Sequence, residues 1–161
     1  MKKILFMLIF GLFATVAFAQ ITSLLDFNLV GITEKEFCKI TKTTVIATND
    51  DLLQKGFPHH SYSTTWGPLG DPINLAVRYG ADGLSDLVAI GLTVTDHNPM
   101  LWVTTFMMLQ VRGTIIGKDS NGIIYSRQQE GAVMLNGQGE GVVGLFLMTP
   151  TVAKGFGIAG Y

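Results

Sequence analysis

The chain has 161 residues, of which 48% are hydrophobic, and it carries 11 Lys and Arg against 12 Asp and Glu. This length suits one domain with a core of its own. The near-neutral charge, with no cluster of Lys or Arg, argues against nucleic acid and anionic membrane surfaces as partners, because both attract concentrated positive charge.

Residues 1–19 have the order of a secretory signal peptide. Two lysines follow the initiating Met, residues 4–13 are almost wholly apolar, and Ala17-Phe18-Ala19 offers the small residues of a cleavage site. The uncharged run is shorter than the roughly 20 residues of a membrane-spanning helix. We therefore expect cleavage after Ala19, which leaves residues 20–161 as a single β-rich domain that is secreted, periplasmic or on the cell surface.

Cys38 is the only cysteine, so the mature chain has no internal disulfide. Small exported domains often depend on disulfides. This one must be stabilised by packing, by association with other copies, or by both. We interpret Cys38 as a small buried hydrophobe, with an intermolecular disulfide as the alternative.

Two short helices and a strand are expected near the start of the mature chain. The Thr33-Glu34-Lys35-Glu36 segment has the spacing of a capping box and predicts a helix over 34–40. The β-branched run at 43–48 predicts a strand. Asn49-Asp50-Asp51 predicts a further helical turn that ends at Gly56.

A long loop and another strand are expected next. Residues 56–72 contain three prolines, and we interpret them as a loop around a short strand at Tyr62–Trp66. Ile73–Tyr79 predicts the strand that follows.

The C-terminal half is expected to consist of strands. Apolar residues alternate over Val88–Val94, which is the period of a half-buried strand. We interpret Leu101–Val111 as a strand that is apolar on both faces. Such a strand needs a second layer, a subunit interface or lipid on its far side. The residues expected at an interface are Trp102, Phe106 and Met108.

Two hairpins are expected after that strand. Asp119-Ser120-Asn121-Gly122 predicts a type I′ turn between strands at 113–117 and 123–127. Strands at 132–136 and 142–148 form the second pair, and the apolar tail at 151–161 is expected to be docked. Seven to nine short strands predict a mainly β fold, an antiparallel sandwich or a closed barrel, with one or two short N-terminal helices.

Polar and aromatic side chains concentrate between residues 57 and 66. Aromatic rings with polar neighbours suit a carbohydrate or an apolar ligand. A metal or hydrolytic site would require this segment to meet the turn at 96–98. The candidate ligand-binding residues are Phe57, His59, His60, Tyr62 and Trp66.

No catalytic motif, metal-ligand set or cofactor motif stands out, so we assign no catalytic residue, no metal and no cofactor. We expect an exported non-enzymatic β-domain that acts by binding or by self-association, as a surface or matrix component. Two alternatives stay open. One is a small secreted enzyme or metal-binding protein with its site in the 57–66 segment and the 96–98 turn, and the other is a membrane-associating or pore-forming β-protein.

Overall fold

A computed structural model describes residues 29–43, 47–48, 59–66, 71–94, 100–128, 131–137 and 141–161. The described chain is mainly β, with one antiparallel sheet and three short helices. The helices are α2 (Glu34–Thr41), α4 (Leu101–Arg112) and α5 (Pro150–Gly155). The strands are β1 (Ala47–Thr48), β2 (His59–Trp66), β3 (Asp71–Tyr79), β4 (Ser85–Thr93), β5 (Thr114–Lys118), β6 (Ile124–Arg127), β7 (Ala132–Asn136) and β8 (Val142–Met148).

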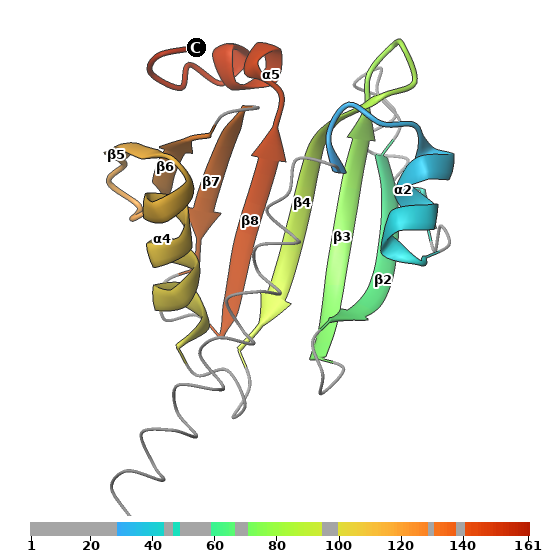
Figure 1. The fold of residues 1–161 in the computed structure, drawn as a ribbon, viewed down its shortest axis with the longest axis horizontal. Coiled ribbons are helices and arrows are strands. Elements are labelled where there is room, and N and C mark those ends of the chain that lie inside the picture. Colours follow the sequence, from blue (N-terminus) through green and yellow to red (C-terminus); the bar gives the residue numbers. More distant parts are fainter. Residues whose placement is uncertain are drawn as a thin grey trace, which may run out of the picture.

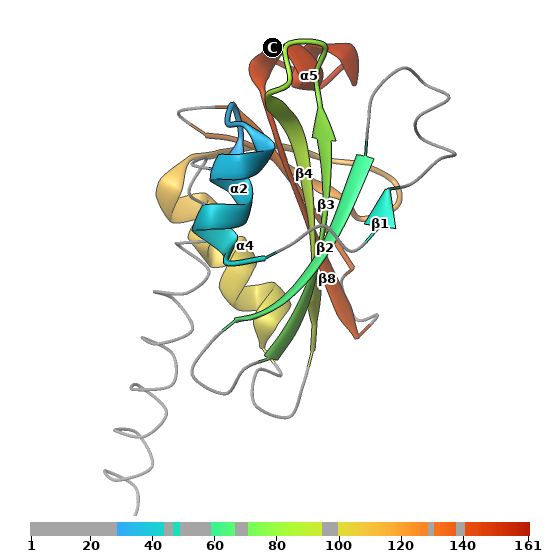
Figure 2. The same ribbon diagram turned by 90° about the vertical axis from the view of Figure 1, so that its right-hand side faces the viewer.

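The sheet is formed by two meanders that meet at its centre. Its strand order is β1-β2-β3-β4-β8-β7-β6-β5, so β4 and β8, the last strands of the two meanders, pair with each other. A helix precedes each meander, α2 before the first and α4 before the second. Both helices cover the same face of the sheet (Figures 1 and 2). The two halves of the molecule therefore follow the same path.

The main core lies between that face and the two helices. Every second residue of β4 is buried there, as Val88, Ile90 and Leu92 show. Phe37 of α2 and Leu109 of α4 pack into the same core, at 0% and 1% exposure. The period-two alternation of the strands thus fixes which face receives the helices.

A smaller core lies on the opposite face, at one end of the sheet. There α5 and the residues after it cover parts of β7 and β8 (Figure 1). Val152, Ala153 and Ile158 pack with Met148, and the Tyr161 hydroxyl donates to the Gly131 carbonyl. The expected docking of the apolar tail is confirmed.

Several predicted elements lie where the sequence places them. The capping box is present, because the Thr33 hydroxyl accepts from the Glu36 amide and the Glu36 carboxylate accepts from the Thr33 amide. Strands β7 and β8 have the predicted bounds. The predicted helical turn at 49–56 lies outside the described residues.

The predicted strand at Tyr62–Trp66 is confirmed, but the loop predicted on either side of it is wrong at the described residues 59–61 and 71–72, which are also strand. Residues 59–66 form one continuous strand that pairs along its whole length with β3, from His59↔Arg78 to Trp66↔Asp71. The five uninterrupted Ser, Tyr and Thr residues at 61–65 suit a pleated strand, and this outweighs the prolines on either side.

The predicted strand at Leu101–Val111 is wrong, because these residues form helix α4. Its buried residues, Leu101, Thr105, Met108 and Leu109, follow the three- and four-residue spacing of a helix. Nearly every position in the run is apolar, so period two and period 3.6 describe it equally well. The length of the run, twelve residues in the helix, was the better guide.

The turn between β5 and β6 is not type I′. Gly122 has φ 82°, but among the described non-glycine residues only Lys42 has a positive φ, so Asn121 does not. The Asp119 side chain explains the difference. Its Oδ1 accepts from the amides of Asn121 and Ile123, each at 2.9 Å, which favours a type I turn followed by a left-handed glycine.

The predicted sandwich and closed barrel are also wrong for the described part of the chain. All eight described strands belong to one sheet. Its two edge strands are β1 and β5, each of which pairs with a neighbour on one side only. Helices supply the second layer instead. Leu101–Val111, which was predicted as a strand, belongs to one of these helices.

Candidate functional site

A cluster of polar aromatic and ionisable side chains lies where α2 crosses β2 and β3. Alternation along β2 places His60 and Tyr62 on the helix-covered face, and Tyr79 of β3 shares that face. Glu34 begins α2 and reaches the same place. We call these four residues, Glu34, His60, Tyr62 and Tyr79, the α2 cluster.

The α2 cluster is joined by a continuous series of hydrogen bonds. His60 Nδ1 lies 2.5 Å from Glu34 Oε1, and the Tyr62 hydroxyl donates to the same oxygen at 3.1 Å. The Tyr62 and Tyr79 hydroxyl oxygens are 2.9 Å apart. Since the single Tyr62 proton goes to Glu34, Tyr79 donates to Tyr62.

Burial keeps the two tyrosines neutral. Tyr62 is 1% exposed and Tyr79 is 4% exposed. Burial raises the pKa of Tyr79 to about 12, and the negative charge of Glu34 acts in the same direction. The pKa of Tyr62 is raised further, first by burial and then by its hydrogen bond to Tyr79. Both phenols therefore act as hydrogen-bond donors in the neutral pH range.

Cys38 lies beside this cluster, one helical turn after Glu34. Burial raises the pKa of its thiol, and the negative charge of Glu34 raises it as well, while a hydrogen bond with Thr43 lowers it. The net direction disfavours the thiolate, which is the nucleophilic form. Cys38 is only partly buried against the core, less than its sequence context predicts, and its surroundings are not those of an activated nucleophile.

The structure brings together two of the five candidate ligand-binding residues, His60 and Tyr62. His59 and Trp66 belong to β2, but their side chains lie outside the described part of the structure, as does all of Phe57. The turn at 96–98 lies outside it too.

Sequence reasoning missed two members of the α2 cluster, Glu34 and Tyr79. Glu34 lies at one of the two middle positions of the capping box, to which the motif assigns no role, so its sequence context did not mark it as a site residue. It is 26 residues from His60 along the chain, and no local pattern connects the two.

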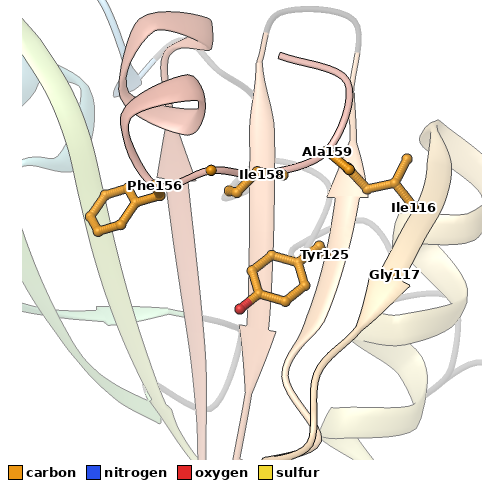
Figure 3. Close-up of a pocket in the computed structure, with 7 residues that line it drawn as sticks. Ile116, Gly117, Tyr125, Phe156, Ile158 and Ala159 are labelled. Atoms are coloured by element: carbon orange, nitrogen blue, oxygen red, sulfur yellow. The ribbon is translucent and has the colours of Figure 1, made fainter.

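A shallow pocket lies on the other face, between the C-terminal tail and β5–β6. It has a volume of about 240 Å³, which is below the roughly 300–1,000 Å³ of ligand pockets. Figure 3 shows Tyr125 beneath the tail segment that carries Ile158 and Ala159, with Ile116 beside them. The Tyr125 hydroxyl is directed to Asp119. The pocket thus lacks the converging polar groups of a specific ligand site.

The outer side of α4 is apolar and exposed. Its inner side belongs to the core, yet Met107 is 49% exposed and Val111 is 79% exposed. Met100, at the N-cap, and Val103 are also exposed, at 54% and 40%. We call these four residues the α4 stripe.

The predicted interface residues occupy other positions on α4. Met108 is only 3% exposed and packs in the core, so its assignment to an interface is corrected. Trp102 and Phe106 are partly buried, and their rings stack with centroids 5.4 Å apart. The strand interpretation had also placed Trp102 and Phe106 apart from Val103, Met107 and Val111, but it grouped them with Met108, which the helix buries.

Among the described residues, no three His, Cys, Asp or Glu side chains converge closely enough to hold a metal ion. None of the described helices combines the length and apolar character needed to cross a membrane. Comparison with protein-family models, with curated protein sequences and with solved structures finds no match for this chain.

Proposed function

We propose that the protein is an exported, non-enzymatic domain that acts through protein–protein contact at the α4 stripe. The carrying observation is the exposure of four apolar side chains along one side of a helix whose other side is in the core. A contiguous apolar patch of this kind is typical of interaction surfaces, because burying it in a contact removes it from water.

The export part of the proposal rests on residues 1–19, which lie outside the described structure. A positive start, an apolar run and a small-residue cleavage site support transfer across a membrane. Outside the cell or in the periplasm, a domain without a disulfide benefits from association with other molecules, which stabilises the folded state by mass action.

Site-specific photocrosslinking in the cells that naturally make the protein would test this function. A benzophenone amino acid at position 107 should give crosslinked protein adducts, since this position lies in the contact. Position 142 is the matched control, because Val142 is 47% exposed, against 49% for Met107, and lies on β8, outside the stripe. Equal adduct yields at both positions, or none at either, would contradict the proposal.

The α2 cluster favours a second candidate function, proton transfer at His60. A carboxylate bound to Nδ1 fixes the tautomer that leaves Nε2 with a lone pair, as in general-base sites. An activated ester such as p-nitrophenyl acetate is a simple probe. His60→Gln should abolish any hydrolysis above the buffer rate, whereas the neighbouring His59→Gln should keep it. Equal rates of hydrolysis in wild type and His60→Gln would contradict a role of His60 in proton transfer.

A further inference from the structure

The α4 stripe has a regular spacing that restricts what can cover it. Its members follow one another at intervals of three, four and four residues, which places them in one row along the helix. Large and small side chains alternate in this row, in the order Met100, Val103, Met107, Val111.

We propose that the occupant of the stripe is a second copy of this chain, with the two α4 helices antiparallel about a twofold axis. This inference rests on the proposed function and names the partner of the same surface. A twofold axis at residue 105 sets Val103 opposite Met107 and brings Met100 to within one residue of Val111, and symmetry repeats both pairs. Each flexible Met then meets a compact Val. A parallel pair would instead oppose Met to Met and Val to Val.

The charge of α4 favours a protein over a lipid surface as the occupant. A helix that lies on a membrane usually carries several Lys or Arg beside its apolar side. In α4, Arg112 is the only charged residue. The stripe is also the convex outer side of a helix, and small molecules bind in concave sites.

The two edge strands of the described sheet are less suited to self-association than the α4 stripe. Edge strand β5 has a register irregularity between Ile115 and Gly117, and it ends in Lys118. Bulges and edge lysines both hinder strand-to-strand pairing. The other edge strand, β1, has two residues within the described part of the chain.

The size of the surface predicts a weak dimer. A helix of twelve residues is about 18 Å long, so one helix pair covers much less than the roughly 800 Å² per partner of a stable interface. We therefore expect a dissociation constant in the micromolar range or weaker.

Disulfide trapping of purified residues 20–161 tests this geometry. In a Cys38→Ser background, Val103→Cys and Met107→Cys proteins are prepared separately, mixed and mildly oxidised. The antiparallel pair predicts that the mixed 103–107 disulfide forms at least about tenfold faster than either same-residue disulfide, because only opposed residues bring their Cα atoms within about 7 Å. Val142→Cys gives the rate of random collision, and circular dichroism verifies that each variant is folded.

Every outcome of this experiment bears on the pairing. Faster same-residue disulfides would overturn the antiparallel arrangement, and rates equal to that of Val142→Cys would overturn self-pairing. If the monomeric protein instead sediments with phosphatidylserine vesicles, a lipid surface is the occupant and the inference fails. Photocrosslinks from position 107 to a different protein would support the proposed function but would show that the partner is not a second copy of this chain.

Discussion

Two buried hydroxyl groups, on Tyr62 and Tyr79, depend on one another. Tyr79 donates to Tyr62, and Tyr62 donates to Glu34, so each polar atom has a partner inside a region that excludes water. Removing one hydroxyl leaves the other without its hydrogen-bond partner, and an unsatisfied buried polar group costs about 1–3 kcal/mol.

This coupling predicts non-additive effects of Phe substitution. Tyr62→Phe removes the acceptor of the Tyr79 proton and should lower the free energy of unfolding by about 2 kcal/mol. The double variant Tyr62→Phe/Tyr79→Phe leaves no tyrosine hydroxyl without a partner. Its loss in free energy of unfolding should therefore be smaller than the sum of the losses in the two single variants. Urea denaturation of the three variants measures this. Strict additivity would show that the hydroxyls do not interact.

Raised tyrosine pKa values predict a loss of stability in alkali. A phenol whose pKa is higher in the folded state stabilises the fold below its unfolded value of about 10, and that contribution is lost as pH rises through the folded value. For Tyr79 the folded pKa is about 12. The tyrosinate absorbance of Tyr62 and Tyr79 should therefore appear together with the loss of the circular dichroism signal. Ionisation of all four tyrosines near pH 10 in a still-folded protein would contradict this.

Part of the α2 cluster could be predicted from the sequence. His60 and Tyr62 were candidates because polar and aromatic residues concentrate around them, and their separation by two residues puts them on one face of a strand. Glu34 and Tyr79 join them only through the packing of α2 on the sheet. That contact is long-range, and no pattern within one segment encodes it.

At the scale of elements, α4 shows why a uniformly apolar segment misleads. Periodicity identifies an element only when small or polar residues alternate with large apolar ones, as Ala89, Gly91 and Thr93 do in β4, whose alternation predicted a strand correctly. In α4 both sides are apolar, one facing the core and the other exposed. The segment remains apolar on two sides after the correction, but these two sides follow a helical period.

The connection from α4 to β5 requires Gly113. A Cβ atom built at this position would overlap the Arg127 carbonyl oxygen, and the close atom is backbone. Gly113→Ala should therefore lower the free energy of unfolding by about 3 kcal/mol.

Gly117→Ala, in the following strand, is the matched control for that substitution. Nothing lies within 4 Å of a Cβ at position 117, so its effect should stay within about 0.5 kcal/mol. Thermal unfolding of the two variants gives the comparison. Equal stabilities would show that the chain adjusts at Gly113 without strain.

At the scale of the whole molecule, the mainly β character could be predicted but the layering could not. Turn residues and alternation located most strands, including both pairs of hairpin strands near the C-terminus. The pairing of β4 with β8 joins segments separated by α4 and three further strands. Such long-range pairing leaves no local signature, so neither the single open sheet nor the repeated helix–meander path could be derived.

Export predicts a defined N-terminus for the mature protein. Cleavage after Ala19 should leave Gln20 as the first residue, because the small residues at positions 17 and 19 precede that bond. Intact-mass measurement of the protein recovered outside the producing cytoplasm tests this. A recovered protein that still carries residues 1–19 would refute cleavage.

Self-association through the α4 stripe is measured most directly by sedimentation equilibrium of residues 20–161 over a wide concentration range. Wild type and Val142→Lys should both form dimers reversibly. Met107→Lys should weaken dimerisation at least tenfold, because symmetry places the charge in the contact twice. A strictly monomeric wild type, or the same dissociation constant for Met107→Lys and Val142→Lys, would contradict contact between copies at this helix.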